Sequence, residues 1–511
     1  MVRAPVPVLV GCGQITQREP DPRRARAPIE LMSDVSLIAA QDSGAAAAAL
    51  AAVDTLVVIR SFSDTSWRFA CPFGRYANPP KSLAARLGAT AARRLVYTAQ
   101  GGNMPQACVN RLSGMIARGE AEVALIAGGE ALATQKSAER AKLALDWSED
   151  AGGEPEVWGD ARCGWSDMED RHGMRGAIYA YPLFENAIRG QLGRTIAEHG
   201  LAMGRLLAGF AQVAAANPLA DRRQGFSAEA IAASGPDNPY IGFPYTKLMN
   251  ANAFIDQAAA LLLMSTDKAR ALGIPQDKWI YLHGCADAHD HWFISDRVDF
   301  HSSPAMRTVA KEAFAMAGTR LDALSQLDVY SCFPSAVEIA AREMDLALED
   351  ERGLTVTGGL PYFGGPGNNY VTHAIAEMMS RLRAAPGTIG LVTANGNYVT
   401  KQSAGIYSSA PPPAPFAPRP AAEYQAAIDA MPGPPVRKRA EGPARIETYT
   451  IVHERSGPSF AIVVGRLADG SRFMANTPKD AALLRSMTEE DMLGTHGRVH
   501  SHDGRNVFVP D

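Results

Sequence analysis

The chain has 511 residues, 46% of them hydrophobic and 20% charged, so it can bury a large core and is expected to form more than one domain. Its formal net charge of −4 gives no electrostatic reason to expect nucleic acid or an anionic membrane as a partner. The six cysteines are scattered without a CxxC pair, which argues against a disulfide framework and indicates a reducing cytoplasm. No apolar stretch approaches the ~20 residues of a membrane-spanning helix.

The N-terminal part of the chain predicts an alternation of strands and helices. Strands are expected at residues 7–10, 54–60 and 94–97, and helices at the alanine-rich residues 43–53 and at 82–87. Because such alternation is typical of wound α/β sheets, we expect a sheet covered by helices.

A glycine turn, Gly101-Gly102, starts the stretch on which the interpretation depends. Apolar residues at helical spacing run from Met104 to Ile116, and Gly119 ends the predicted helix where a left-handed cap is needed. Residues 122–127 then predict a short buried strand. The free backbone amides at the start of such a helix form an anion-holding site.

The middle of the chain interrupts this alternation and then resumes it. Residues 131–245 contain amphipathic pieces at 177–188 and 206–215, which predicts an inserted, mostly helical subdomain. A second set of elements follows, with strands expected at 256–264, 279–283, 327–330 and 388–394 and helices at 308–317, 334–345 and 368–382.

The C-terminal part has a different composition. Residues 410–422 are proline-rich and predict an extended linker. Beyond them, residues 423–511 predict a small β-rich domain resembling a partial barrel. Its strands are expected at 446–452, 460–467, 472–476 and 507–509, with a short helix at 480–487.

Particular residues in this pattern resemble thiolases. Ile116, Gly119 and Ala127-Gly-Gly-Glu130 resemble the end of the nucleophile helix and the strand after it. Residues 245–264 resemble the segment that re-enters the second thiolase half. The branch that the chain resembles is the type-1 thiolase-like proteins, which are related to the sterol-carrier-protein thiolases and carry an additional C-terminal domain.

This resemblance implies a fold. It is a duplicated αβαβα core built from an N-terminal half, residues 1–130, and a C-terminal half, residues 246–409. Residues 131–245 would be the inserted loop domain, which in thiolases helps to hold coenzyme A, and the tail would be an OB-like domain.

The resemblance also implies where catalytic residues belong. Thiolases use a cysteine that carries the acyl group, a histidine that activates it, and a second cysteine that moves a proton at the substrate α-carbon. In this chain those positions fall at Gly102, at Gly365 and at Thr393. Because none of the three supplies a thiol or an imidazole, we expect negligible thiolase turnover. Cys108 lies further into the helix and is interpreted as a small buried hydrophobe.

The glycine turns at the two helix starts are expected to keep a binding function. They leave two amide-lined pockets with room between them, which could bind a thioester carbonyl or a carboxylate without reacting with it. The expected contacts for coenzyme A or an acyl-CoA are Gly101, Gly102, Gly364, Asn395 and Gly396.

Tyr330 is the remaining candidate for a catalytic role. The related branch carries His-Asp-Cys-Phe where this chain has Tyr330-Ser331-Cys332-Phe333. Some thiolase-like aldolases lack the cysteine and use tyrosines for retro-aldol cleavage of an acyl-CoA. Tyr330 could act as acid or base if its pKa is suitable; otherwise it packs and donates one hydrogen bond. Possible second partners are Tyr362, Tyr370 and Tyr398.

Histidine-rich runs do not predict a metal site. The ligands in Asp287-Ala-His289-Asp290-His291 are too close in sequence to reach one ion without a tight loop, so a solvated loop is expected there. His496, His500 and His502 are expected in a polar tail segment, and His373 as a satisfied core or surface histidine.

The sequence leaves three functions open, and with them the question of whether the chain is an enzyme. It could bind coenzyme A or an acyl-CoA without thiolysis, cleave or form a carbon–carbon bond on an acyl-CoA through Tyr330, or catalyse weak acyl transfer or thioester hydrolysis. Each would belong to acyl-CoA and lipid metabolism in the cytoplasm, without a covalently bound cofactor. Either a monomer or a thiolase-type homodimer is expected, because the additional domain could block the edge strand through which thiolases pair.

Overall fold

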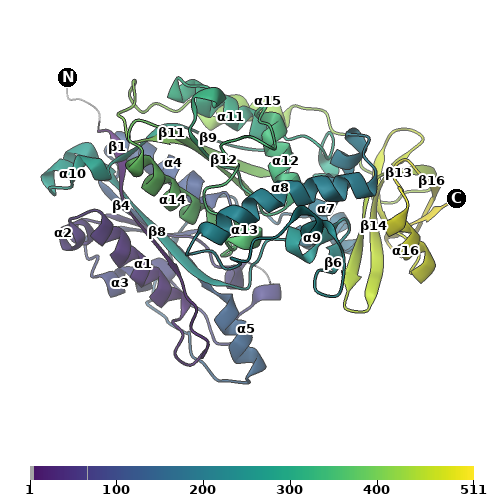
Figure 1. Ribbon diagram of the computed structural model, residues 1–511, viewed down its shortest axis with the longest axis horizontal. Helices are drawn as coiled ribbons and strands as arrows, with labels where there is room; N and C mark the ends of the chain where they lie inside the picture. Colours follow the sequence, from purple (N-terminus) through teal and green to yellow (C-terminus); the bar gives the residue numbers. More distant parts are fainter. Residues whose placement is uncertain (1–4, 66) are drawn as a thin grey trace.

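The chain folds around two β-sheets (Figure 1). The computed structural model describes residues 5–65 and 67–511, so residues 1–4 and 66 of the predicted N-terminal half lie outside the described part. The larger sheet has ten strands in the order β10-β11-β12-β9-β1-β8-β4-β2-β3-β5. Their bounds are β1 Pro7–Thr16, β2 Thr55–Val58, β3 Arg94–Thr98, β4 Val123–Ala131, β5 Glu156–Trp158, β8 Asp256–Ser265, β9 Ile280–His289, β10 Gln326–Asp328, β11 Ile389–Gly396 and β12 Lys401–Ser408.

The pairing in this sheet repeats itself on either side of the contact between β1 and β9. On one side β2 is parallel to β4, β4 is antiparallel to β8, and β8 is antiparallel to β1. On the other side β10 is parallel to β11, β11 is antiparallel to β12, and β12 is antiparallel to β9. The sides meet where Val8 and Leu9 pair with Tyr281 and Ile280. The predicted duplication is therefore confirmed as two copies of one strand pattern.

Helices α4 (Met104–Ala117) and α14 (Tyr370–Ala384) form the central layer. Each contacts β1 and β8 from one half and β11 and β12 from the other, and the two helices contact each other (Figure 1). Helix α1 (Pro28–Asp42) packs on β1, β8 and β4, and α11 (Pro304–Ala317) packs on β9 and β12. Because side chains alternate along β1, Val8 and Val10 join the core cluster of α1 while Leu9 joins that of α4. The predicted αβαβα layering is confirmed.

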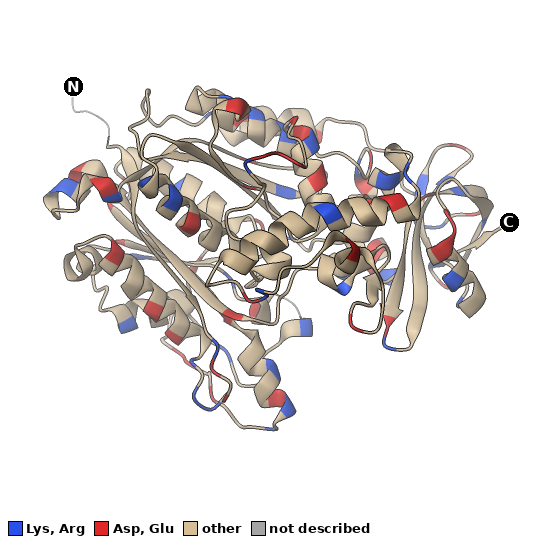
Figure 2. Ribbon diagram, in the orientation of Figure 1, with Lys and Arg blue, Asp and Glu red and all other residues tan. Residues whose placement is uncertain are grey.

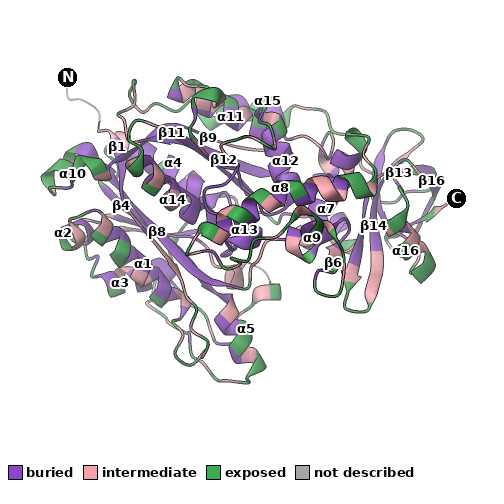
Figure 3. Ribbon diagram, viewed as in Figure 1, coloured by how far each residue is buried: buried purple, intermediate pink, exposed green. Residues whose placement is uncertain are grey.

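Burial on both faces explains why the central strands have continuous apolar sequences. All residues of β8 are buried, and Figure 3 shows the same for the middle of the sheet and for much of α4 and α14. The other helices of the core are α2 Ala46–Ala51, α3 Pro79–Leu87, α10 Thr266–Ala271, α12 Pro334–Glu343 and α13 Gly359–Tyr362.

The elements that the sequence pattern misses include α1, β12 and α15 (Ala421–Asp429). Helix α15 starts inside the segment that was expected to be an extended linker, so that expectation is wrong for its last two residues. Tyr424 and Ile428 of α15 are buried, and this tertiary packing outweighs the proline-rich composition just before it.

The inserted segment is mostly helical, as predicted, but its strands belong to other parts of the molecule. Its helices are α5 Leu132–Arg140, α6 Asp167–Arg171, α7 Ala177–Gln191, α8 Ile196–Ala216 and α9 Ala228–Ala232. Strand β5 pairs with β3 at the edge of the core sheet. Strands β6 (Tyr240–Gly242) and β7 (Tyr245–Thr246) extend the second sheet, where Gly242 pairs with Val452.

The C-terminal part forms a small barrel-like domain, seen in yellow in Figure 1. Its strands are β13 Gly442–Glu454, β14 Gly457–Leu467, β15 Arg472–Asn476, β16 His496–His502 and β17 Arg505–Pro510, with helix α16 Ala481–Glu489. The order β14-β15-β17-β16-β13 closes through pairing of β13 with β14. The buried guanidinium of Arg472 fastens this domain to the core by donating to the backbone oxygen of Ser295 at 2.9 Å.

The surface carries charges of both signs. Lys, Arg, Asp and Glu alternate along the helices and loops of both domains in Figure 2. Within residues 5–65 and 67–511, no helix combines the length and apolarity needed to cross a membrane.

Candidate functional site

The turn before α4 needs glycine at Gly101. Its φ of 143° lies in the region that favours glycine. The Gly101 amide donates to Asn368 Oδ1 at 3.0 Å, and Asn368 comes from the loop before α14. The two predicted helix starts therefore meet at one place, and one amide that was expected to face a ligand already has a protein partner.

Position 102 needs a residue without a side chain because other atoms lie very close to it, and not because of its backbone angle. A Cβ atom placed on Gly102 would lie 2.1 Å from Tyr330 Oη and 2.7 Å from the backbone oxygen of Asn395. Ordinary contact distances are ~3.5–4.0 Å. The space that a nucleophilic side chain would occupy is thus filled by the tyrosine hydroxyl, and the open room expected between the glycine turns does not exist at this point.

Tyr330 is held by residues that the sequence singled out. It follows β10, and its backbone amide donates to Thr393 Oγ1 of β11 at 2.9 Å. Its ring packs edge-on against Tyr370, with centroids 5.8 Å apart. Tyr370 in turn donates to Asp328 Oδ1 at 3.1 Å. Two of the positions to which the resemblance assigned catalytic residues, Gly102 and Thr393, therefore both lie against Tyr330.

Burial fixes the protonation state of this tyrosine. Desolvation raises the pKa of Tyr330 well above its ordinary value, and the nearby Cys332 adds to the rise. At neutral pH the side chain is a phenol that can donate a proton or a hydrogen bond. This is opposite to the lowered pKa that a general base would need.

The second glycine turn, Gly364-Gly365, is also closely packed. Gly364 has φ 125°, and a Cβ on it would lie 2.6 Å from Gln257 Oε1. The Gly365 amide donates to the backbone oxygen of Asn252 at 2.8 Å, and a Cβ on Gly365 would lie 3.3 Å from Leu360 Cδ2. Gly365 thus has an apolar neighbour, and its own amide is already bonded within the protein.

The loop after β11 approaches the same place in an unusual conformation. Asn397, Tyr398 and Val399 have positive φ values of 49°, 57° and 66°. Each such non-glycine residue costs roughly 1–2 kcal/mol, so the surroundings must hold the turn. Asn395 Oδ1 does so by accepting from the Val399 amide at 3.2 Å, and it also accepts from Tyr181 Oη at 3.3 Å.

A cavity of about 400 Å³ opens beside the start of α4. Its walls include Asn103, Arg111, Trp158, Trp292 and Lys401. Among the described residues, Asn103 Oδ1 is buried and has no hydrogen-bond partner. No single sequence motif marks this cavity, because its walls come from α4, β5, β9, β12 and α15.

Lys401 is the buried cation of this region. Its Nζ donates to the backbone oxygens of Gln100 at 2.6 Å and Asp160 at 2.9 Å. Burial lowers the pKa of Lys401 to about 8, although the Asp160 carboxylate favours the charged form. The ammonium therefore sits against the turn that precedes Gly101.

The other singled-out side chains have structural surroundings. Tyr362 packs on Phe226, and Tyr398 packs on Trp165 and Tyr181. Cys108 is buried, and desolvation raises its pKa to about 12, as befits a core residue. His373 is fully buried in α14 beside Gln14 Oε1 at 2.9 Å, and desolvation lowers its pKa to about 3.

The histidine-rich runs are not loops. Residues 287–289 end strand β9, Asp290 is buried, and its carboxylate accepts from Ser303 Oγ and the Ala305 amide. The expectation of a solvated loop there is wrong, since Tyr424 and Gln425 of α15 bond to the backbone of Asp287 and His289 at this end of the strand. His496, His500 and His502 lie on the exposed face of β16.

Taken together, a duplicated core, two glycine turns at paired helix starts and a tyrosine over the first turn define a thiolase-like protein. Solved structures agree with this class. The chain is 15% identical to an acetyl-CoA acetyltransferase from Syntrophomonas wolfei, with a TM-score of 0.55 over 80% of this chain and 99% of that one. It is 18% identical to the Ltp2-ChsH2(DUF35) aldolase, with a TM-score of 0.58 over 80% of this chain and 98% of that chain. At these identities the likeness shows the fold alone.

A third structure is much more similar. It is a monomeric SCP2-thiolase-like protein type 1 from Mycobacterium smegmatis, 37% identical, with a TM-score of 0.85 and all of both chains covered. Residues 423–505 match the family described as the thiolase-like protein type 1 additional C-terminal domain. The chain belongs to the SCP2-thiolase-like proteins of type 1. No curated protein matches it.

Proposed function

We propose that this protein binds coenzyme A or an acyl-CoA non-covalently and has little or no thiolase turnover. The observation that carries the proposal is the contact between Gly102 and Tyr330. A thiolase needs a thiol at the start of this helix, and here the hydroxyl of Tyr330 occupies the space next to a residue without a side chain. Loss of the nucleophile and of its base together removes acyl-enzyme chemistry.

The cavity beside α4 supports the binding part of the proposal. Its volume of about 400 Å³ lies within the ~300–1,000 Å³ range of ligand pockets. Arg111 and Lys401 supply positive charge for the anionic groups of a CoA ester, and the rings of Trp158 and Trp292 supply apolar surface. The unpartnered Asn103 Oδ1 can accept from an amide of the ligand.

Calorimetry with coenzyme A and several acyl-CoAs tests binding. We expect Arg111→Ala to weaken binding by roughly 10-fold, as loss of a charge-assisted contact does. Arg320→Ala, at an exposed site outside the cavity, is the control and should bind like the parent protein. Absence of heat at millimolar ligand would end the proposal.

The position of Tyr330 favours a second candidate, an aldol or retro-aldol reaction on an acyl-CoA. In the cleavage direction a base removes the β-hydroxyl proton, the bond between the α- and β-carbons breaks, and an acid returns a proton to the α-carbon. A buried, protonated Tyr330 beside the α4 start is suited to the acid step. Tyr330→Phe should abolish turnover of a β-hydroxyacyl-CoA, whereas Tyr362→Phe should not. Unchanged turnover in Tyr330→Phe refutes this role.

A third alternative, weak acyl transfer or thioester hydrolysis through the backbone amides, differs from pure binding by its product. A thiol-release assay on an acyl-CoA distinguishes the two. Free thiol at a rate above the uncatalysed reaction would replace the binding proposal with this one.

We also infer that the protein is a monomer of the reducing cytoplasm. Strand β5 of the same chain pairs with β3, so the β3 edge of the core sheet is not open to a second copy. The six cysteines are free, which suits a reducing compartment. Light scattering on the purified chain should give the mass of one copy, and a dimer mass would contradict the inference.

A further inference from the structure

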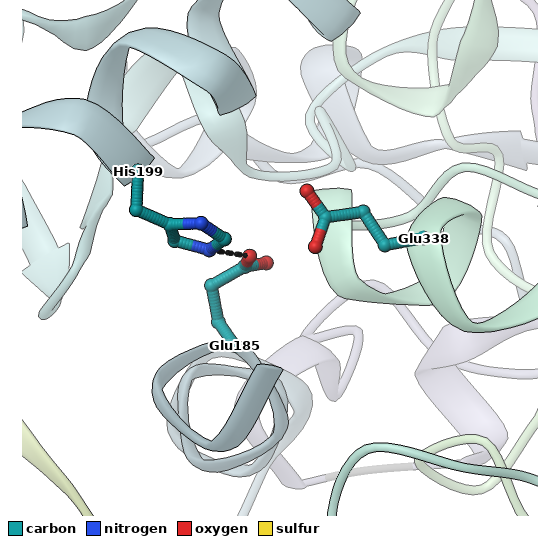
Figure 4. A group of neighbouring side chains, drawn as sticks. All are labelled: Glu185, His199 and Glu338. Carbon is teal, nitrogen blue, oxygen red and sulfur yellow. Dashed lines mark hydrogen bonds and ion pairs between the residues drawn. The ribbon is translucent and has the colours of Figure 1, made fainter. Parts of the chain in front are cut away.

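Three buried side chains from three helices converge outside the thiolase-like centre. They are Glu185 of α7, His199 of α8 and Glu338 of α12 (Figure 4). One ligand atom from each lies within 4.8 Å of the others. Glu185 and His199 have no exposed surface, and Glu338 is 7% exposed.

Part of this cluster is bonded and part is not. Glu185 Oε1 lies 2.6 Å from His199 Nε2, and Glu185 Oε2 accepts from Tyr245 Oη at 2.6 Å. Within the described residues, neither oxygen of Glu338 has a hydrogen-bond partner, nor does His199 Nδ1. Figure 4 shows the Glu338 carboxyl directed toward the other two groups.

Such an arrangement is costly if nothing else binds there. A buried polar group without a partner costs ~1–3 kcal/mol, and a buried charge without one costs more. Two carboxyl groups side by side also repel when both are ionised. A divalent cation removes both penalties, since it bonds to the carboxylates and balances their charge.

One residue of the cluster, Glu338, also lies at the wall of a cavity. Glu338 lines a cavity of about 350 Å³ together with Ile188, Leu192, Arg194 and Leu346. Arg194 Nη1 is buried and has no partner among the described residues. A water molecule or small anion between the cluster and Arg194 would give hydrogen-bond partners to Arg194 Nη1 and to the unpaired atoms of the cluster.

We propose that Glu185, His199 and Glu338 bind one divalent ion of the zinc type, with a further coordination position open to this cavity. One imidazole and two carboxylates are suited to Zn²⁺ and related transition metals, while Mg²⁺ and Ca²⁺ prefer oxygen ligands only. Three protein ligands and one open position are the pattern of sites where a metal meets water or a substrate. This ion does not use the residues proposed to bind an acyl-CoA.

Metal uptake by the full chain tests the proposal. The protein is stripped with a chelator, dialysed against Zn²⁺ and analysed for bound metal, and Co²⁺ serves as a spectroscopic probe of the ligand set. We expect one ion per chain and a higher melting temperature with Zn²⁺. In Glu338→Gln, which keeps the shape of the side chain, we expect a loss of affinity larger than the ~10–100-fold caused by removing an outer partner.

Surface histidines provide the matched control. The triple variant His496→Gln, His500→Gln and His502→Gln removes the exposed histidines of β16 and should still bind one ion. Uptake that is lost in this variant but kept in Glu338→Gln overturns the proposal, as does a stripped parent protein that binds neither Zn²⁺ nor Co²⁺. Anomalous scattering from a zinc-soaked crystal of the parent protein decides the case independently of any variant, because a peak must lie between the three side chains.

Discussion

Asp328 and Glu338 lie close together in the sequence and are both buried carboxyl groups, but their surroundings are opposite. Asp328 accepts hydrogen bonds from Thr355 Oγ1 at 3.0 Å, from the Val356 amide at 3.0 Å and from Tyr370 Oη at 3.1 Å. Glu338 has no partner within the described residues. Burial raises the pKa of both, to about 6 for Asp328 and about 8 for Glu338.

This difference separates two uses of a buried acid. Asp328 is satisfied by the protein itself and holds Tyr370, whose ring packs against Tyr330, so its role is structural. Glu338 forms no hydrogen bond of normal geometry within the described chain and faces another carboxyl group, Glu185, which is why it points to a bound ion. Glu130 is intermediate, since its Oε1 accepts from the Phe62 amide at 2.7 Å. Substitutions at these sites can test whether the number of hydrogen-bond partners of a buried acid predicts how far its loss lowers the free energy of unfolding.

The largest effect is expected at Asp328. Asp328→Leu leaves the buried Val356 amide without an acceptor. It also removes the charged acceptor of Thr355 and Tyr370, which keep only Thr357 Oγ1 within reach. We therefore expect a loss of about 4 kcal/mol in the free energy of unfolding. Asp328→Asn keeps one acceptor oxygen and should cost less than half as much. Urea unfolding at pH 7.5 measures both. A loss under 2 kcal/mol for Asp328→Leu would show that these bonds do not hold the centre together.

The second largest effect is expected at Glu130, in the dependence of stability on pH. Burial raises its pKa from 4.5 to about 8, and the nearby carboxylates of Asp64 and Asp256 contribute to the rise. The folded state therefore binds the proton more tightly than the unfolded state. The resulting stability is fully present below pH 4.5 and is lost as the pH rises through about 8.

The amide of Glu130→Gln can still accept the Phe62 hydrogen bond but does not titrate. We expect it to flatten the stability profile between pH 5 and 8 by up to about 4 kcal/mol, at ~1.4 kcal/mol per pKa unit. Equal slopes in the parent protein and in Glu130→Gln would contradict the raised pKa. Urea unfolding at half-unit pH steps gives both slopes.

A smaller effect is expected when the lost nucleophile is restored. In Gly102→Cys the new Cβ meets Tyr330 Oη and the backbone oxygen of Asn395, and overpacking of this kind costs about 1–3 kcal/mol. Adding Tyr330→Ala relieves the first contact only. Gly209→Ala, at a helical position with open space around it, is the control and should not destabilise the protein. Thiolysis assays on both cysteine variants should still show no turnover, because Gly365 supplies no base.

The sequence could predict the fold because its signals are local. Apolar runs such as 256–264 and glycine turns such as Gly101-Gly102 are read from neighbouring residues, and the family resemblance fixed their order. Elements held by distant contacts were missed. Helix α15 depends on burial of Tyr424 and Ile428 against the core, which composition does not reveal.

The candidate sites also include features that local motifs reveal and features that only distant contacts create. The positions that the resemblance assigns to catalytic residues follow from motifs, so Gly102, Gly365 and Thr393 could be singled out from the sequence. That the Tyr330 hydroxyl fills the space at Gly102 depends on two strands distant in sequence. Glu185, His199 and Glu338 come from three helices with no common spacing, so no linear pattern could connect them.

The smallest effect distinguishes the two carboxyl groups most directly. In chelator, Glu338→Met removes an acid that has no protein partner and fills its space with an apolar side chain, which should raise the free energy of unfolding by about 1 kcal/mol. Glu343→Met on the same helix is the matched control. Glu343 accepts from the Ser303 amide at 2.8 Å and pairs with Arg307, so its loss should destabilise the protein. With Zn²⁺ the parent protein should become more stable than Glu338→Met, because only the parent protein gains stability from the ion. If Glu338→Met is less stable than the parent protein in chelator, Glu338 has a partner of its own and the contrast with Asp328 fails.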